Sequence, residues 1–238
     1  MDQNEARCLF AVESGSRAWG FESANSDYDV RFVYWKSRDW YLSIENHQDV
    51  IEEMGEDDLD FAGWDLRKAL KLANKSNPSL HDWLATVEFY YRDDTFFEEF
   101  AGLCREYFDP NACYHHFRSM ATTNFKDFSE ASELPFKKYF YVFRALLCGR
   151  YIQEHLSPAP CLFSDLLNEF YPSGSTRDEL EKLLELKKSG SEVSKTKQIP
   201  VLHKEIHRLF ENTANEPPKR ELLSTVKLND FFRRVVLS

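Results

Sequence analysis

FAVESGSRAWGFESANSDYDVRFVY, residues 10–34, is the stretch that decides the fold of this chain. It begins inside a short apolar run, residues 9–12, which predicts a buried strand over residues 7–13. The run gives way to the polar turn Glu-Ser-Gly-Ser at residues 13–16. Residues 27–34 are rich in aromatic and β-branched side chains and partly alternate with polar ones, which predicts a second strand.

Two aspartates stand at the start of this second strand. Side chains alternate between the faces of a strand, so we expect Asp27 and Asp29 on one face and Tyr28, Val30 and Phe32 on the other, in a core. Neighbouring carboxylates repel each other unless a positive charge lies between them. Their oxygens suit a hard cation, so the pair predicts a site for Mg²⁺ or Mn²⁺.

The turn after the first strand supplies the second half of the pattern. Gly15 allows the backbone to approach a ligand closely, and the amides and hydroxyl of Ser16 can donate to phosphate oxygens. Arg17 is a further phosphate ligand or else a surface charge. A Gly-Ser turn or an Asp-x-Asp pair alone is common, but both in this order, each attached to an apolar strand, favour metal-dependent phosphoryl or nucleotidyl transfer.

These motifs resemble a known superfamily. Gly15-Ser16 followed by Asp27-Tyr28-Asp29-Val30 is similar to the signature of the DNA polymerase beta-type nucleotidyltransferases. More narrowly, ESGSRAWGFESANSDYDVRFVYW, with the later GWDLRKAL and KSNP, resembles the RNA repair pathway polymerase-beta-like, YcgL-type group. The resemblance extends over most of residues 7–170. It implies a small mixed sheet flanked by helices, a metal-bound nucleoside triphosphate (NTP) and a helical C-terminal half.

The superfamily pattern also implies a third acidic residue on a later strand, flanked by apolar residues. Asp60 matches it, on the second strand of a hairpin predicted around residues 55–57, and would serve as metal ligand and general base. Asp58 ranks second and Asp65 is a further candidate. Asp65 also falls in the first turn of a helix predicted over residues 63–73, where a negative side chain complements the helix dipole.

The remaining chain predicts a last strand near residues 89–91 and then helices. We expect helices at 79–86, 95–107, 110–128, 135–155, 163–170, 176–188 and 217–237, with another after Pro200. The fold class is therefore α+β: a small mixed β-sheet nucleotidyltransferase core with flanking helices, followed by an all-α C-terminal domain. We place the catalytic domain at 1–92 and the helical domain at 93–238.

One helix of the second half carries candidate ligands. Lys137, Tyr141 and Arg144 fall at i, i+4 and i+7 on one stripe, from which they could close on a triphosphate, and Lys138 is the alternative phosphate ligand. The YcgL-type group carries a similar Lys-x-x-Tyr and Arg-x-Leu-Leu pattern. In the same half we interpret His116 as a packed histidine. His203 and His207 lack a third ligand, so we assign them to a solvated face.

Composition excludes several classes of protein. The 238 residues include five scattered cysteines with no CxxC pair, which indicates free thiols, no zinc finger and a cytoplasmic location. Neither a membrane span nor a signal peptide is evident. The formal net charge of −10 argues against a strongly basic nucleic-acid binder, but leaves room for a local basic groove.

The sequence thus predicts a metal-dependent enzyme that transfers a nucleoside monophosphate from an NTP to a hydroxyl acceptor and releases pyrophosphate. The resemblance suggests RNA as the acceptor, while the residues leave open an RNA 3′ end, a tRNA, a protein hydroxyl or a small molecule. The alternatives are a protein-modifying nucleotidyltransferase and a non-catalytic, nucleotide-binding or antitoxin-like regulatory protein.

Overall fold

The computed structural model describes residues 6–55, 59–129, 133–189, 195–212, 216–221 and 223–237. The chain forms two compact units. We call the first the sheet unit; it contains the described parts of 6–18, 27–108 and 221–237. The second, the helical unit, contains those of 19–26 and 109–220. The loop between the two halves of the signature thus belongs to the helical unit.

The sheet unit is built on a five-stranded mixed sheet in the order β3-β4-β2-β1-β5. Its strands are β1 (Arg7–Glu13), β2 (Tyr28–Trp35), β3 (Val50–Met54), β4 (Leu59–Asp65) and β5 (Phe89–Arg92). Its helices are α1 (Gly15–Ala18), α2 (Arg38–Leu42), α3 (Leu66–Asn74), α4 (Pro78–Ala85), α5 (Asp94–Glu106) and α11 (Val226–Leu237). The α+β class and the mixed sheet expected from the sequence are confirmed.

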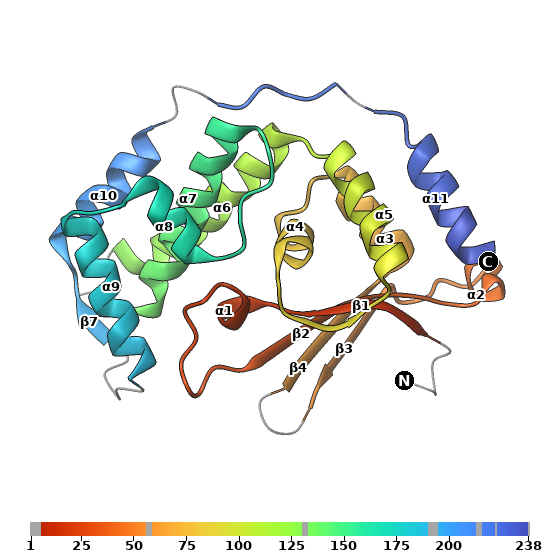
Figure 1. The fold of residues 1–238 in the computed structure, drawn as a ribbon, viewed down its shortest axis with the longest axis horizontal. Helices are drawn as coiled ribbons and strands as arrows, with labels where there is room; N and C mark the ends of the chain where they lie inside the picture. Colours follow the sequence, from red (N-terminus) through yellow and green to blue (C-terminus); the bar gives the residue numbers. More distant parts are fainter. Residues whose placement is uncertain are drawn as a thin grey trace. The chain divides into compact units, whose positions relative to one another are not determined.

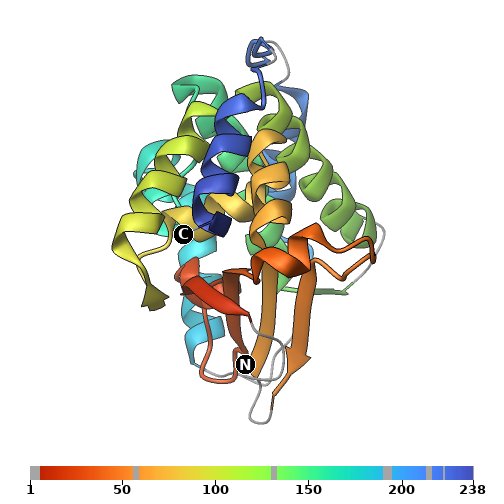
Figure 2. The ribbon, with the colours of Figure 1, turned by 90° about the vertical axis from the view of Figure 1, so that its right-hand side faces the viewer.

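One face of the sheet carries the main core. The helices α3, α4, α5 and α11 lie on this side (Figure 1), and Figure 2 shows α11 beside α3 and α5. Phe10 of β1 is fully buried here against Phe97 and Phe100 of α5, with ring centroids 5.3 and 6.1 Å away. Val33 of β2 and Phe231 of α11 join the same cluster. Burial of these large rings is the main reason that the helices stay on the sheet.

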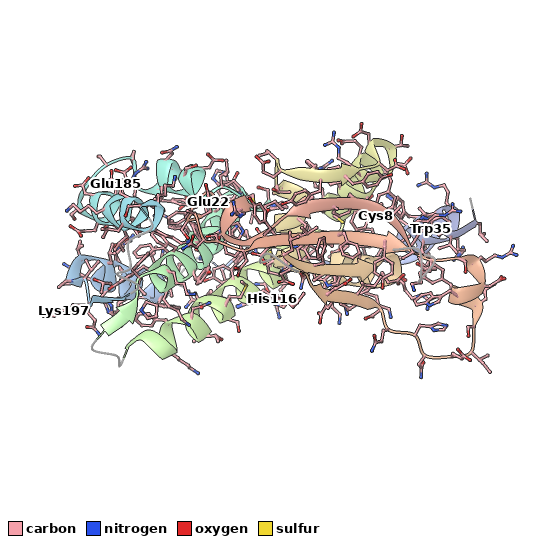
Figure 3. All side chains as sticks on the ribbon, turned by 90° about the horizontal axis from the view of Figure 1, so that it is seen from below. Cys8, Glu22, Trp35, His116, Glu185 and Lys197 are labelled. Carbon is pink, nitrogen blue, oxygen red and sulfur yellow. The ribbon has the colours of Figure 1, made fainter. Side chains whose placement is uncertain are left out.

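The opposite face, toward the viewer in Figure 3, carries a smaller apolar cluster. Val30, Phe32 and Tyr34 of β2 alternate onto this face and are buried, as the pattern predicted for the first two. Phe32 pairs with Gly63 of β4, and a Cβ atom there would lie 2.1 Å from the Phe32 ring, so only glycine lets the ring lie across the neighbouring strand. Tyr28, expected in this core, is instead 44% exposed because it starts the strand at the edge of the cluster.

Side-chain caps fix the helix that follows β4. Residues 63–65 pair with β2 and remain in the strand, so α3 begins only at Leu66, later than predicted. Asp65 is its N-cap, accepting from the backbone N–H of Arg67 at 2.8 Å. Asp65 also accepts a hydrogen bond from Tyr41 Oη at 2.5 Å and is buried, so it belongs to the fold and not to the candidate site.

Ser76 and Asn77 in the connection from α3 to α4 have different roles. Asn77 caps α4, accepting from the Leu80 N–H at 3.1 Å. Ser76 is not a cap: it adopts a positive φ of 50°, is fully buried, and its hydroxyl donates to the Tyr107 carbonyl at 3.3 Å.

The chain divides after residue 108, beyond the predicted boundary at 92. The reason is that Phe10 needs the aromatic face of α5 to cover it, so α5 stays with the sheet. The C-terminal helix begins at Val226, later than the expected start at 217, and returns to the sheet unit. Tyr107 holds the segment before it by donating to the Ser224 carbonyl at 2.5 Å.

The helical unit is centred on the antiparallel pair α6 and α7. It contains α6 (Pro110–Ser129), α7 (Lys137–His155), α8 (Phe163–Phe170), α9 (Ser175–Lys188), α10 (Pro200–Glu211) and a two-stranded ribbon of β6 (Glu133–Pro135) and β7 (Lys195–Lys197). None of the helices in the described ranges is long and apolar enough to cross a membrane.

A buried histidine in α4 makes the stability of the sheet unit depend on pH. His81 is 5% exposed, lies edge-on against Phe108, and its Nε2 atom has no hydrogen-bond partner among the described residues. Burial lowers the pKa of His81 to about 4. Below its ordinary pKa of about 6.5 the unfolded chain binds a proton that the folded chain does not, so stability falls as the pH drops.

We therefore expect the free energy of unfolding to fall by about 3 kcal/mol between about pH 6.5 and pH 4 on account of this residue. Urea denaturation across this pH range measures the slope, and His81→Leu should remove that contribution. His116→Leu, at an exposed histidine, is the control and should leave the slope unchanged. An unchanged slope in His81→Leu would contradict the assignment.

Candidate active site

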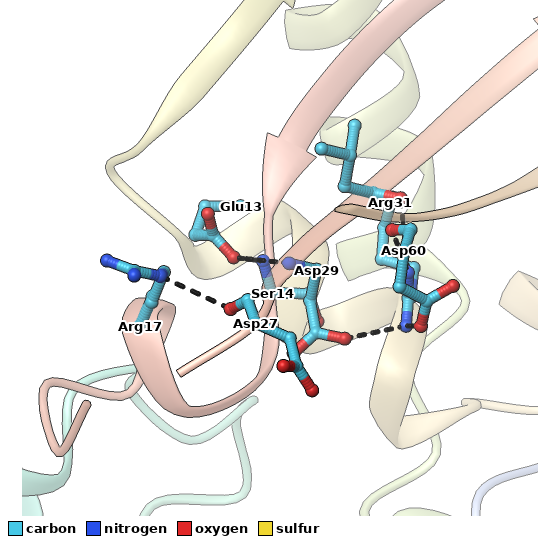
Figure 4. A network of polar contacts seen from close by, with 8 residues as sticks. Glu13, Ser14, Arg17, Asp27, Asp29, Arg31 and Asp60 are labelled. Atoms are coloured by element: carbon cyan, nitrogen blue, oxygen red, sulfur yellow. Dashed lines mark hydrogen bonds and ion pairs between the residues drawn. The ribbon is translucent and has the colours of Figure 1, made fainter. Parts of the chain in front are cut away.

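The register of the two parallel strands places two of the predicted aspartates side by side. Asp29 on β2 is the direct partner of Asp60 on β4. Both side chains point to the face that α3 covers further along the strands, since Val33 and Trp64 on the same face belong to that core. Asp27 lies two residues before Asp29, just ahead of β2, and is exposed. The structure thus brings Asp27, Asp29 and Asp60 to one end of the sheet (Figure 4).

An arginine lies between the paired carboxylates. Arg31 Nη2 donates to Asp29 Oδ1 at 2.9 Å and to Asp60 Oδ2 at 2.7 Å. Its Nη1 atom donates to the carbonyls of Asp60 at 2.8 Å and Val30 at 3.2 Å. Arg31 therefore joins the two strands and neutralises part of the negative charge of the site.

A buried glutamate ties the Gly-Ser turn to β2. Glu13, 4% exposed at the end of β1, accepts through Oε1 from the backbone N–H groups of Asp29 at 3.0 Å and Ser14 at 3.2 Å. Its Oε2 atom accepts from Tyr90 Oη at 2.5 Å. The Ser14 N–H also donates to the Asp29 carbonyl at 2.9 Å. Glu13 thus fixes the backbone of Asp29 relative to the turn.

The glycine of the turn is in direct contact with Asp29. Gly15 has a φ of +62°, and a Cβ atom built on it would lie 2.0 Å from Asp29 Oδ2. Ser16 follows on the short helix α1 and is half-buried. Arg17 faces the start of β2: its Nε donates to the Asp27 carbonyl at 3.2 Å and its guanidinium lies 3.8 Å from the centre of the Tyr28 ring. The two halves of the signature therefore meet in space at Gly15 and Asp29.

The charge around Asp29 is strongly negative. Burial raises the pKa of Asp29, and the nearby carboxylates of Asp60, Glu13 and Asp27 raise it further, while Arg31 opposes them. A cation beside such a group relieves the repulsion between the carboxylates, and Arg31 does so in part here.

The donor set fits Mg²⁺ or Mn²⁺. Three carboxylates supply hard oxygen ligands, and the missing side chain at Gly15 leaves Asp29 Oδ2 against the turn. The ligand oxygens of the three aspartates do not all lie within 4.8 Å of one another, and Arg31 is bonded to both Asp29 and Asp60. Asp58, the second-ranked candidate, falls outside the described residues.

The predicted ligands on α7 lie in the helical unit and have different environments. Lys137 is exposed, and Lys138 and Tyr141 are half-buried. Arg144 is 3% exposed: its guanidinium donates to the Cys161 carbonyl and lies 4.3 Å from the centre of the Trp19 ring. Arg144 therefore does not share an open stripe with Lys137. It packs inside the unit because α7 is buried on most of its surface.

Two predictions for histidines on neighbouring helices need correction. His116 is exposed on α6, not packed, because Tyr114 and Phe117 occupy the buried face. His203 is not on a solvated face: its ring lies 5.7 Å from that of Tyr139 and 6.1 Å from that of Phe125. Its ring packs against aromatic side chains of α6 and α7.

Sequence reasoning missed Arg31, Glu13 and Tyr90. Arg31 carried a signal, since it continues the alternation of Asp27 and Asp29 on the same strand face. Glu13 was assigned to the end of the first strand and the turn, with no role in the site, and its contact with Asp29 depends on the pairing of β1 with β2. Tyr90 reaches Glu13 across 77 residues of sequence, which no local pattern reveals.

The mixed sheet, with the aspartates and the Gly-Ser turn at one end, is the arrangement expected of the polymerase beta-like nucleotidyltransferase class. Residues 1–234 match the RNA repair pathway DNA polymerase beta family (RlaP), and the chain belongs to that family. It is 44% identical over 234 residues to the uncharacterized protein YcgL of Bacillus subtilis (strain 168), covering 97% of this chain and 90% of that protein.

A solved nucleotidyltransferase-like protein from Exiguobacterium sibiricum 255-15 is a more distant neighbour. It is 12% identical with a TM-score of 0.29, over 87% of this chain and 67% of that one, a likeness too low to bear on the site.

Proposed function

We propose that this protein is a metal-dependent nucleotidyltransferase that moves a nucleoside monophosphate from an NTP to a hydroxyl acceptor, an RNA end, and releases pyrophosphate. The observation that carries the proposal is the cross-strand pair Asp29 and Asp60 with Asp29 Oδ2 against the Gly15 turn. This arrangement joins a carboxylate cluster to a backbone that a phosphate chain can approach.

Each residue of the cluster has a distinct role in the proposal. Asp27 and Asp29 would hold Mg²⁺ or Mn²⁺, with Asp60 as the third ligand. The bound metal would supply Lewis acidity to the phosphate oxygens. Asp60, adjacent to Asp29, would also take the proton from the acceptor hydroxyl. Glu13 keeps the backbone of Asp29 in place through its bond to the Asp29 N–H.

The turn would bind the phosphates of the NTP. These phosphates would lie against Gly15 and Ser16, and Arg17 would add a positive charge beside Tyr28. Lys137, Lys138 and Tyr141 are the further candidates on α7. Arg144 is the weakest of the proposed nucleotide ligands, since its guanidinium is already bonded inside the helical unit.

A groove in the sheet unit with two basic and no acidic lining residues supports RNA as the acceptor. The groove has a volume of about 280 Å³ and lies between α3 and α11. None of its lining residues is acidic, although the chain has 40 acidic and 30 basic residues. The lining residues are Arg67, Leu70, Lys71, Asn74, Thr225, Leu228, Asn229 and Phe232.

Two cations line the groove, and a third lies beyond it on the same side of the helix. Arg67 and Lys71 line the groove, and Lys75, the C-cap of α3, follows them at the same four-residue interval. Lys71 and Lys75 are exposed and form no ion pair within the described residues. Lys71 and Lys75, with the carboxamides of Asn74 and Asn229 near Lys71 in the groove, suit a strand of phosphates, whereas Arg67 already donates to the Tyr41 carbonyl.

The proposal is tested by incubating the protein with each labelled NTP, Mg²⁺ and single-stranded RNA, and measuring pyrophosphate release and label on the RNA. Transfer to RNA is the expected result. Nucleotide binding without pyrophosphate release would overturn the proposed enzymatic activity. Label on protein but not on RNA would overturn RNA as the proposed acceptor.

A charge reversal in the groove tests the acceptor independently. Lys71→Glu should weaken RNA binding several-fold and lower its salt dependence by about one to two ions, because it removes one cation and adds one anion. Fluorescence anisotropy at several salt concentrations measures this. Arg38→Glu, at an exposed arginine outside the groove, is the matched control; equal losses in the two variants would count against the groove.

A further inference from the structure

Arg31 forms hydrogen bonds inside the proposed metal site. Its guanidinium has four acceptors: one oxygen each of Asp29 and Asp60, and two backbone carbonyls. Its side chain is 18% exposed, against 26% for Asp29 and 35% for Asp60. Arg31 is therefore a partly buried cation on the same carboxylates that the proposed function assigns to a metal.

The charges of the site show why this cation matters. Asp29 feels three other carboxylates, those of Asp60, Glu13 and Asp27, and Arg31 is the cation that opposes them. An oxygen that accepts from the guanidinium is less available as a metal ligand, and a positive charge at this place repels a second one.

We propose that Arg31 is a built-in competitor of the divalent cation, which makes the metal and the NTP bind cooperatively. This inference rests on the proposed function. While Arg31 holds Asp29 and Asp60, a free divalent cation binds weakly. A triphosphate offers the guanidinium new acceptors, which frees the two carboxylate oxygens for the metal that arrives with the nucleotide.

The anchoring of Arg31 makes such an exchange feasible. Nη1 is held by the carbonyls of Val30 and Asp60, whereas Nη2 makes both carboxylate contacts. Loss of the carboxylate contacts therefore leaves the guanidinium anchored at the site. A planar guanidinium also matches two oxygens of a phosphate, so it exchanges one anionic partner for another.

The inference is tested by measuring Mn²⁺ binding with electron paramagnetic resonance, under conditions without turnover. Arg31→Gln should bind Mn²⁺ alone about ten-fold more tightly than the unmodified protein, since a competing charge is removed. A non-hydrolysable NTP should raise Mn²⁺ affinity strongly in the unmodified protein and much less in Arg31→Gln. Arg38→Gln removes an exposed charge elsewhere and is the matched control.

Thermal melting supplies a second readout and guards against misfolding. Without metal, Arg31→Gln should melt at a lower temperature than the unmodified protein, because Asp29 and Asp60 then face each other without a counter-ion. Mn²⁺ should raise the melting temperature of Arg31→Gln by more than that of the unmodified protein. Arg31→Lys keeps a charge that cannot bridge both carboxylates as well and should give an intermediate Mn²⁺ affinity.

Equal or weaker Mn²⁺ binding by Arg31→Gln would overturn the inference, and so would an undiminished effect of the NTP. The proposed function is judged separately by Asp29→Asn. If that variant binds Mn²⁺ and NTP together as well as the unmodified protein does, the metal site itself is misplaced.

Discussion

Asparagine in place of Asp29 is expected to lower the rate of nucleotide transfer by about 10³-fold or more, a loss of the size seen when a preorganised charge is removed from a reacting centre. Asp29 is at the centre of the site. It pairs with Asp60 across the strands, lies against Gly15, and has its backbone fixed by Glu13. Asp60→Asn should be similarly severe, because it removes both a ligand and the proposed base.

The fold should survive this change. Burial and three neighbouring carboxylates raise the pKa of Asp29, so its ionised form is less favourable in the folded protein than in the unfolded chain. The sign follows: the carboxyl group costs stability as the pH rises through its range, and that cost persists at neutral pH. Asparagine removes the charge and keeps the shape, which offsets the weakened contact with Arg31.

Initial rates of pyrophosphate release, with circular dichroism and melting temperature for each variant, measure both effects. Asp39→Asn is the matched control, since Asp39 has an 89% exposed side chain in the same unit. It should retain full activity. A folded Asp29→Asn that still transfers nucleotide at the original rate would rule out the metal-ligand role of this residue.

The part of the site that depends on strand periodicity was predictable from the sequence. Alternation put Asp27 and Asp29 on one face, and apolar neighbours marked Asp60 as a strand residue. The structure brings the three to one end of the sheet. The bounds of β1 and α8 also agree with the prediction, because each is a compact apolar segment with clear polar ends.

The residues that organise the site could not be predicted in the same way. Arg31 acts across the β2–β4 pairing, and Glu13 acts across β1 and β2, so both roles depend on a register that local sequence does not encode. The burial of Arg144 could not be predicted for a related reason. Helical periodicity identified its stripe on α7, but not that the loop containing Trp19 covers it.

Gly15→Ala should lower the rate of transfer by about 10²-fold, because a displacement of about 1 Å at a reacting centre has an effect of this size. The new methyl group would lie 2.0 Å from Asp29 Oδ2, closer than real atoms approach, so either the carboxylate or the turn must move. The positive φ of 62° adds strain of about 1 kcal/mol for a residue with a Cβ atom. We therefore expect a large loss of transfer rate and only a small loss of folding stability.

A second glycine separates these two effects. Gly174 also has a positive φ, 110°, but a Cβ atom there would meet nothing within 4 Å. Gly174→Ala should lose stability through backbone strain and keep its activity, whereas Gly15→Ala should also displace Asp29. Melting temperatures and transfer rates of both variants make the comparison, with Mn²⁺ binding as a third measurement. If Gly15→Ala loses only as much activity as Gly174→Ala, the close approach of Asp29 to the turn has no part in the reaction.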